Sequence, residues 1–282
     1  YGKKILIIRV AYLLLFCLSA AGLYLAIERS AARGAVDQVG TQLPAAAGPL
    51  IPFCLLSLVM VNALAVTSIT GERDGRTLDL LLVSDLSPRE FLIGKIGGVF
   101  YVCRDMLLLP LALCLYLWFR GGISLENLLY TTLGLAVMNL FVAVLGVHCG
   151  RIHANSRTAI TVSLGTVFFL FLGVATCIQL MISFRGSFQF QLAPFLAFIL
   201  GGGVGLYVAI GHRTPSSAIG LAAILVPFAT FYAITSFFLE AYLPMFLVTA
   251  GAYGFTCAAM LIPALSELDF AQGRGREMMS ED

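Results

Sequence analysis

The chain has 282 residues, of which 60% are hydrophobic and only 11% are charged, and its formal net charge is +2. A soluble domain carries about 25% charged residues, so this composition excludes an ordinary soluble protein and indicates a chain that crosses a membrane several times. A net charge this small also gives no reason to expect a nucleic-acid partner.

Eight apolar runs are long enough to cross about 30 Å of hydrocarbon at 1.5 Å per residue. Lipid satisfies no backbone polar group, and the runs are too long and too evenly apolar for barrel strands, so each is expected to be a helix. In chain order they are Ile5–Ile27, Gly48–Ile69, Ile96–Phe119, Leu128–Val147, Ala159–Phe184, Leu192–Ile210, Ala218–Phe238 and Ala241–Leu265.

The sequence therefore predicts an all-α, polytopic membrane bundle of about eight spans. The sixth and seventh runs are the weakest, and "GGGVG" at Gly201–Gly205 indicates either close helix packing or a re-entrant break. Six spans plus a re-entrant hairpin is thus the alternative. The seven cysteines form no C-x-x-C pair and the three histidines lie singly in the sequence, so no metal site is predicted.

The distribution of Lys and Arg predicts the orientation of the spans. With the N-terminus inside, one set of loops carries Lys3, Lys4, Arg73, Arg76, Arg89, Lys95, Arg151, Arg157, Arg213, Arg274 and Arg276. The opposite set carries Arg29, Arg33, Arg120 and Arg185. Because cytoplasmic loops are the more basic ones, both termini are expected in the cytoplasm. Residues 1–266 then form one transmembrane domain, followed by a flexible polar tail over residues 267–282.

A short charged segment between the second and third spans, Gly71–Lys95, reads "GERDGRTLDLLLVSDLSPREFLIGK". Glu72 and Arg76 have the i,i+4 spacing of a helical ion pair, with the acid at the favourable N-terminal position. Leu78, Leu81 and Leu82 line one face, which indicates a short amphipathic helix around residues 76–83 that lies on an apolar surface.

The second half of this segment contains a helix-start signal. Ser87 is a candidate N-cap, Pro88 occupies the first helical position, and Glu90 stands three residues after the cap. This is the pattern of a capping box with a proline where its missing N–H costs nothing. We therefore expect a helix that begins at Pro88 and continues through Gly94 and Lys95 into the third span.

The acids of the segment decide between two interpretations of its function. A solvated linker that only sets topology needs Arg and Lys, but it has no need of acidic residues. Five acids occur in these 25 residues: Glu72, Asp74, Asp79, Asp85 and Glu90. Mixed charge, an amphipathic helix and a capped helix start favour a protein-docking surface on the cytoplasmic side.

The stretch "ITGERDGRTLDLLLVSDLSPREFLIGK" resembles the signature between the second and third spans of ABC-2 type transporter permeases. The matching positions are Ile69, Thr70, Glu72, Arg73, Thr77, Leu78, Asp79, Leu81, Leu82, Ser84, Leu86, Ser87, Arg89, Glu90, Gly94 and Lys95. "GRIHANSRTAI" at Gly150–Ile160 is similar to the basic loop before the fifth span of that family. The chain departs from the pattern at Arg76 and Asp85, where many members have Gly and Pro, and it has two apolar runs beyond the usual six.

The resemblance implies the permease subunit of an exporter in a bacterial inner membrane, paired with a second permease subunit, identical or different. The segment 70–95 would be the coupling element that docks on a separate nucleotide-binding subunit. The implied partner-coupling residues are Glu72, Arg73, Arg76, Thr77, Asp79, Asp85, Ser87, Arg89 and Glu90. Because the chain lacks G-x-x-x-x-G-K-[ST], ATP and Mg²⁺ are expected in the partner, and this chain is expected to have no cofactor and no enzymatic activity of its own.

Three charged residues are expected within the spans, namely Arg9, Arg104 and Asp105. Arg9 lies about one turn inside the first span and is expected to reach back to the interface. Arg104 and Asp105 lie about 13–15 Å beyond Lys95 along a continuous helix, and adjacent residues of a helix do not face each other. We therefore expect a structural ion pair with another helix, with Arg9 as one partner for Asp105, and a translocation-path site as the alternative.

Two other functional classes compete with the transporter. A membrane anchor or assembly scaffold would keep the docking element but move no substrate. An intramembrane enzyme is disfavoured, because no Ser/His pair, carboxylate pair or metal cluster converges at one depth in the sequence.

Overall fold

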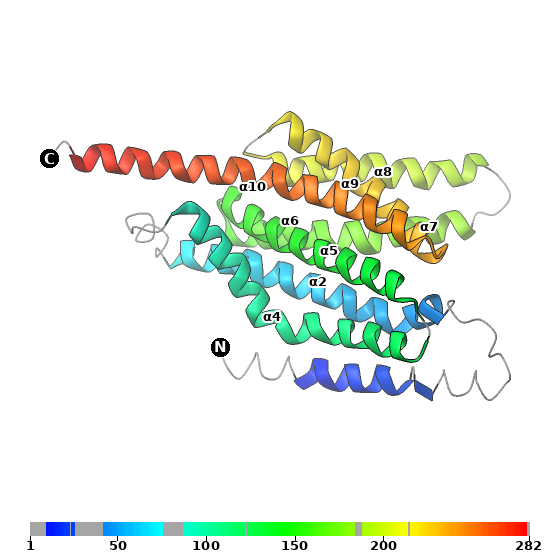
Figure 1. Cartoon of the computed structure of the whole chain (residues 1–282). Helices are drawn as coiled ribbons and strands as arrows, with labels where there is room; N and C mark the ends of the chain where they lie inside the picture. The colour runs from blue at the N-terminus through cyan, green and yellow to red at the C-terminus, as the bar shows by residue number, and fades with distance from the viewer. Residues whose placement is uncertain are drawn as a thin grey trace.

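The computed structural model describes the backbone of residues 10–22, 24–25, 42–75, 87–121, 123–183, 188–213 and 215–280. Side chains are described over the same ranges except at residues 42–49, 88, 188 and 267–280. Every regular element in these ranges is a helix, and seven of the helices are long and apolar enough to cross a membrane (Figure 1). The predicted all-α bundle of apolar helices is therefore confirmed.

An apolar helix at Val10–Gly22 precedes the seven candidate spans. The elements that follow are α2 (Gln42–Asp74), α4 (Pro88–Phe119), α5 (Leu125–Ile152), α6 (Ser156–Phe168), η1 (Phe169–Gly173), α7 (Val174–Ser183), α8 (Phe188–Gly211), α9 (Ser217–Phe238) and α10 (Tyr242–Ser280). The short π-helix η1 joins α6 and α7 into one span, Ser156–Ser183.

The second to eighth predicted spans each correspond to one of these long helices. Of the first predicted span, Ile5–Ile27, the described part is helical over Val10–Gly22, and most of the rest, including Arg9, lies outside the described residues. The sixth and seventh runs form the unbroken helices α8 and α9, so the alternative with a re-entrant hairpin is wrong. The backbone of α10 continues as helix to Ser280. Most of the tail expected to be flexible is therefore a helical continuation beyond the last span.

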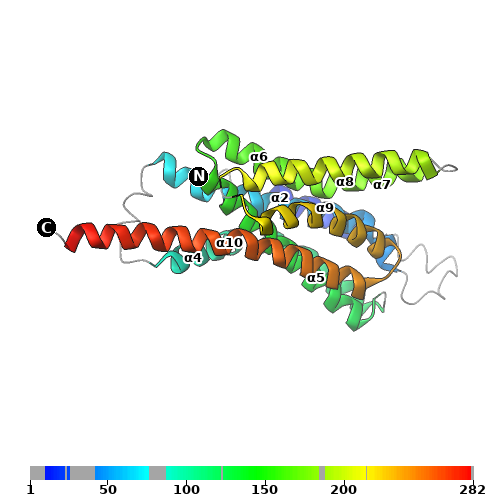
Figure 2. The ribbon, with the colours of Figure 1, turned by 90° about the horizontal axis from the view of Figure 1, so that it is seen from above.

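Helices α2 and α5 occupy the middle of the bundle. α2 packs against α4, α5 and α6, while α5 also contacts α10, and α9 lies between α10 and α8. Figure 1 shows helix Val10–Gly22 and α4 at one edge of this arrangement and α8 at the other. Seen from above in Figure 2, α7 and α8 run side by side along one flank.

Two glycines bring α5 into close contact with α2. A Cβ added at Gly146 would lie 2.7 Å from the Cβ of Ala65 and 2.8 Å from the carbonyl oxygen of Asn62. One turn later, a Cβ added at Gly150 would lie 3.0 Å from the Cβ of Ile69. Small residues four positions apart let helix backbones approach closely in a membrane, so Gly146 and Gly150 set the distance between the two central helices.

A buried polar network adds hydrogen bonds to this contact. The Asn62 amide of α2 donates to the carbonyl oxygen of Val142 on α5 at 2.9 Å. The Ser163 hydroxyl of α6 donates to Asn62 Oδ1, also at 2.9 Å. Both side chains are fully buried, where an unmade hydrogen bond is costly. The network therefore ties α2, α5 and α6 together at a defined register.

Pro110, inside α4, leaves one backbone carbonyl group without its helical hydrogen-bond donor, and a residue of another helix replaces that donor. Pro110 has no N–H, so the carbonyl oxygen of Met106, four residues earlier on α4, loses its helical donor. The Tyr12 hydroxyl of helix Val10–Gly22 donates to that oxygen at 3.2 Å. This hydrogen bond replaces the missing one and joins the first described helix to α4.

The glycine-rich stretch of α8 serves close helix packing, as one of the two sequence interpretations proposed. A Cβ at Gly202 would overlap the Phe169 ring of η1, and a Cβ at Gly203 would lie 3.4 Å from the Ala223 carbonyl oxygen of α9. That carbonyl lacks a helical donor because Pro227 follows four residues later. Gly202 and Gly203 thus let α8 lie against both neighbours.

Candidate functional site

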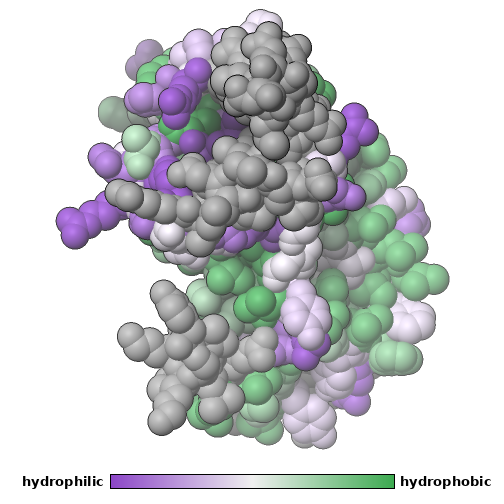
Figure 3. Space-filling model, turned by 90° about the vertical axis from the view of Figure 1, so that its left-hand side faces the viewer, coloured by the Kyte–Doolittle hydropathy of each residue, from purple (hydrophilic) through white to green (hydrophobic). Residues whose placement is uncertain are grey.

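The charged residues gather at the end of the bundle where α2 ends and α4 begins, which we call the charged end. The charges with described side chains there are Arg73, Arg89, Lys95, Arg151, Arg157 and Arg213 together with Glu72, Asp74 and Glu90. At the opposite end the described charges are Arg120, Glu126 and Glu240. Figure 3 faces the charged end and shows hydrophilic side chains gathered over part of it, with hydrophobic side chains along the flank.

The predicted start of α4 is confirmed. Ser87 is the N-cap, and Pro88 is the first residue of the helix. The Ser87 hydroxyl accepts from the Glu90 backbone N–H at 3.3 Å, and the Ser87 backbone N–H donates to Glu90 Oε2 at 3.0 Å. This reciprocal capping box satisfies two backbone donors that a helix start otherwise leaves free. From this cap the helix continues without a break to Phe119.

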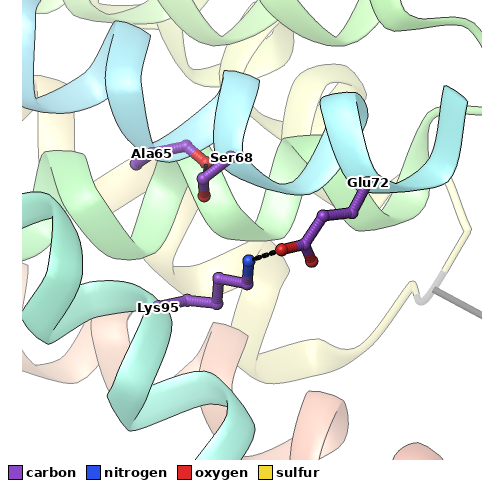
Figure 4. A network of polar contacts seen from close by, with 4 residues as sticks. All are labelled: Ala65, Ser68, Glu72 and Lys95. Carbon is purple, nitrogen blue, oxygen red and sulfur yellow. Dashed lines mark hydrogen bonds and ion pairs between the residues drawn. The ribbon is translucent and has the colours of Figure 1, made fainter. Parts of the chain in front are cut away.

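An ion pair joins the two helices that flank the charged segment. The Lys95 ammonium of α4 donates to Glu72 Oε1 near the end of α2 (Figure 4). The two side chains are only 19% and 29% exposed, so this pair is less screened than one on an open surface. It holds the last turn of α2 against α4.

Arg73, the next residue of α2, holds the turn between α5 and α6. Its guanidinium donates to the carbonyl oxygens of Gly150 (3.0 Å) and His153 and to the Ser156 hydroxyl (3.2 Å). The Ser156 hydroxyl in turn donates to the Asp74 carboxylate at 2.6–2.7 Å. These contacts satisfy carbonyl groups at the end of α5, where a helix leaves acceptors without partners.

We refer to the Glu72–Lys95 pair and the contacts of Arg73 and Asp74 with the α5–α6 turn as the α2 brace. Through the brace, three consecutive residues at the end of α2 connect this helix to α4, to α5 and to α6. A displacement of this end therefore acts on four helices together.

Two histidines of different turns meet beside the brace. His153, in the α5–α6 turn, lies with its ring centroid 5.6 Å from that of His212, which follows α8. His153 is buried, and its Nδ1 lies 3.2 Å from the carbonyl oxygen of Cys149. Burial lowers the pKa of His153 below its ordinary value, and His212 and Arg73 lower it further, although the Cys149 contact opposes them. The histidines are single in the sequence, but the fold brings these two together.

The predicted partner-coupling residues fall into two groups. Arg76, Thr77, Asp79 and Asp85 lie outside the described residues, as does the predicted amphipathic helix around residues 76–83. Glu72, Arg73, Ser87 and Glu90 bond within the chain, and Arg89 is exposed on the first turn of α4. Their contact with a partner stays a prediction. Sequence reasoning missed the inner partners Lys95 and Ser156, which lie 23 and 83 positions away from Glu72 and Arg73.

The charges in the middle of α4 contact each other, and the expected ion pair of Asp105 with Arg9 stays a prediction, because Arg9 lies outside the described residues. Arg104 Nε lies 3.6 Å from Asp105 Oδ1, so the adjacent residues do contact each other. The Arg104 guanidinium also lies 5.0 Å from the ring centroid of Tyr101. The long Arg side chain bends around the helix to its neighbour, which a rule based on Cβ directions does not foresee. Both side chains stay on the outer face of α4, 54% and 40% exposed.

The part of the chain with described side chains contains no group of three or more His, Cys, Asp or Glu that could hold a metal ion. Against models of protein families, residues 32–238 match the model described as ABC-2 family transporter protein. Neither the curated proteins nor the solved structures contain a match to this chain.

Proposed function

The chain belongs to the ABC-2 family of transporter proteins, a family of membrane transport components, and from that premise we propose how it works. It is the permease that couples ATP hydrolysis by a separate nucleotide-binding subunit to the export of a substrate. ATP and Mg²⁺ bind that subunit, which docks on the charged segment between α2 and α4.

The observation that carries this proposal is the α2 brace. Within the charged segment, α2 ends at Asp74 and α4 begins at the capping box of Ser87. Glu72 and Lys95 tie these two points together, and Arg73 ties them to the α5–α6 turn. A force on the segment would therefore reach four spans through hydrogen bonds and ion pairs between rigid helices, which is the physical requirement for coupling.

The charge distribution supports an arrangement with the charged end in the cytoplasm. Among the described side chains, Arg73, Arg89, Lys95, Arg151, Arg157 and Arg213 lie at this end, and Arg120 lies at the other. Cytoplasmic ends carry the excess of Lys and Arg. Both termini would then be cytoplasmic in a bacterial inner membrane, and a second permease subunit, identical or different, would complete the transporter.

The test is to identify a candidate Walker A protein, for which a gene neighbouring that of this chain is the first place to look, to produce the two together, and to measure co-purification and ATP hydrolysis after reconstitution. We expect Glu72→Lys and Lys95→Glu each to lower the ATP hydrolysis rate by about fivefold or more. The double swap restores opposite charges and should recover most of the rate. Arg213→Glu, a reversal at the same end outside the brace, is the control and should leave the rate near that of the wild type.

Failure of the ATP-binding protein to co-purify would contradict the proposal. So would single variants that hydrolyse ATP at the wild-type rate. Binding that persists while none of the reversals changes hydrolysis would favour the alternative of a membrane anchor that moves no substrate.

A further inference from the structure

The span Ser156–Ser183 changes its helical form in the middle, at η1. The Val174 backbone N–H donates to the carbonyl oxygen of Phe169, five residues earlier, whereas in an α-helix the acceptor is four residues earlier. Among the described elements, η1 is the only π-helix. Such turns are rare and are frequent at functional sites, and helices kink at them. The span therefore consists of two α-helical arms, α6 and α7, joined by a turn of different geometry.

The neighbours of the span also change at η1. The arm nearer the charged end, α6, packs against α2 and α5, whereas α7 packs against α8 and α9. Figure 2 shows α7 beside α8 along one flank of the molecule. The two arms of one span thus belong to different parts of the bundle.

The α6 arm is tied to the central helices by hydrogen bonds. The Ser163 hydroxyl donates to Asn62 Oδ1 of α2 at 2.9 Å, in a fully buried position. The Ser156 hydroxyl accepts from Arg73 and donates to the Asp74 carboxylate. Because a buried polar group that loses its partner is costly, a tilt of α6 against α2 is strongly opposed.

The α7 arm has weaker ties to its neighbours. Of its ten residues, Val174 and Cys177 are buried. The Cys177 thiol lies 3.6 Å from the Pro194 carbonyl oxygen of α8, and a thiol is a weak donor. The hydroxyls of Thr176 and Ser183 donate to carbonyl oxygens of the same helical span. A tilt of α7 therefore breaks weaker polar contacts than a tilt of α6 would.

The aromatic ring of Phe169 lies at the joint between the arms. A Cβ added at Gly173 would lie 3.2 Å from this ring, and one at Gly202 of α8 would overlap it. The ring also stacks on that of Phe198, with 6.3 Å between the centroids. Because glycine has no side chain that could interlock with the ring, this contact packs the joint without fixing the angle of α7.

The outer half of α8 is the part that can follow α7. At the charged end, His148 Nε2 of α5 lies within hydrogen-bond distance, 2.9 Å, of the Ile210 carbonyl oxygen near the end of α8. In the outer half, Pro194 interrupts the hydrogen-bond ladder of α8 and contacts Cys177. The charged end of α8 thus stays with α5, while its outer half lies with α7.

We propose that η1 is a hinge at which α7, with the outer half of α8, swings against the body formed by α2, α5 and α6. A hinge consists of a few residues between rigid elements. The ten residues of α7 are about 15 Å long, so a change of about 20° at the π-turn moves its far end by about 5 Å. This inference goes beyond the proposed function, because it gives the outer end of the bundle a movement while the α2 brace holds the charged end together.

Distances between spin labels in the chain alone test the hinge. A ketone-bearing amino acid carries each label, so the native cysteines stay in place. One label replaces Leu129 of α5, and the second replaces Ile182 of α7 or, as the matched control, Thr161 of α6; all three side chains are exposed. The labelled chain is reconstituted in lipid nanodiscs with an excess of unlabelled chain, and double electron–electron resonance measures the distances within one chain.

We expect the two label pairs to differ. The distances from Leu129 to Ile182 should spread over at least about twice the range of those from Leu129 to Thr161, because the two arms of the hinge move differently. An Ile182 distribution as narrow as that of Thr161 would overturn the proposal.

Shortening the π-turn should remove the movement. A π-turn holds one residue more than an α-helical turn, and Leu172 within it is 44% exposed. Removal of Leu172 lets the turn close as an α-helix, and the range of the Ile182 distances should fall about twofold, to that of the Thr161 pair. A shortened chain that is monodisperse and keeps the wide range would contradict the hinge.

A substitution at the joint provides a second test that does not shorten the chain. Gly202→Ala places a methyl group in the Phe169 ring, so the mean Ile182 distance should shift by about 2–5 Å, and adding Phe169→Ala should reverse the shift. Gly201→Ala, where a Cβ meets nothing within 4 Å in the described part of the chain, is the control and should leave the distance unchanged. Equal shifts for the two glycines, or an equal shift of the Thr161 distance, would contradict a joint at η1.

These measurements need no ATP-binding subunit, whereas the test of the proposed function measures ATP hydrolysis. A chain that couples to ATP hydrolysis but shows a rigid α7 loses only the hinge. A chain with a mobile α7 that binds no ATP-binding protein loses only the transport role.

Discussion

Helices α5 and α4 both carry glycines near charged residues. The glycines of α5 face another helix of the bundle, whereas those of α4 lie on its outer surface. On α5, Gly146 and Gly150 are covered by α2, and Arg73 binds the carbonyl groups at the helix end. On α4, a Cβ added at Gly94 or Gly97 would meet nothing within 4 Å in the described part of the chain, and Arg104 lies on the outer face. Similar residues therefore pack against a neighbouring helix in α5 and lie on the outer surface of the bundle in α4.

The largest expected effect comes from filling a covered glycine. Gly146→Ala brings a methyl group to 2.7 Å from Ala65, so we expect the free energy of unfolding to fall by about 1–3 kcal/mol. Gly97→Ala has open space and should raise it by about 0.5 kcal/mol, because Ala is a better helix former than Gly. Unfolding of the detergent-solubilised chain measures both. Equal changes in the free energy of unfolding of the two variants would show that Gly146 and Gly97 are packed alike.

Removing the charge that holds the end of α5 should have an effect of similar size. Arg73→Gln loses charged hydrogen bonds to two carbonyl groups, and we expect a loss of about 1.5–3 kcal/mol in the same assay. Arg213→Gln removes an exposed charge at the same end and should change stability by less than about 0.5 kcal/mol. An Arg73→Gln protein with the stability of the wild type would show that the α5–α6 turn keeps its structure without the Arg73 hydrogen bonds.

A smaller effect is expected on the inner side of α4. Tyr12→Phe leaves the Met106 carbonyl without the donor that replaces the one missing at Pro110, at a cost of about 1 kcal/mol. In a Pro110→Ala background the backbone N–H returns, and the same change should cost much less. Unfolding of the four variants gives the coupling between the two positions. No coupling would mean that the tyrosine hydroxyl does not replace the backbone donor.

The smallest effect is a pH dependence at the end of α5. Burial, the first cause, lowers the pKa of His153 in the folded chain, so the unfolded state binds its proton more readily. Stability from this group is then present above about pH 6.5 and is lost as the pH falls toward the lowered folded pKa. The melting temperature should drop between pH 7.5 and 5, and His153→Asn should flatten that drop. An unchanged slope would assign the drop to other groups.

Local signals in the sequence predicted the elements well. Ser87, Pro88 and Glu90 lie within four residues, and their capping box forms as the pattern indicates. The length and apolarity of each run predicted the helices, because lipid leaves the backbone no alternative. The resemblance in the charged segment identified the family that the match over residues 32–238 bears out.

Contacts between distant residues could not be predicted in the same way. Glu72 meets Lys95 across 23 positions, and His153 meets His212 only because α5 and α8 end at the same level. The pattern G-x-x-x-G at Gly146 and Gly150 is a usable sequence signal for the α2–α5 contact. The contact between Arg104 and Asp105 depends on the reach of the Arg side chain, and the expected pairing of Asp105 with another helix stays a prediction.

The length of α10 has a consequence for how the proposed ATP-binding subunit could approach the charged end. The apolar part of this helix ends at Ser266, whereas its backbone continues to Ser280, a further distance of about 21 Å at 1.5 Å per residue. Figure 1 shows this rod projecting past the other helices at the charged end. A subunit that approaches the segment between α2 and α4 must sit beside the rod, so its footprint on the permease is off-centre, with α10 as a wall on one side.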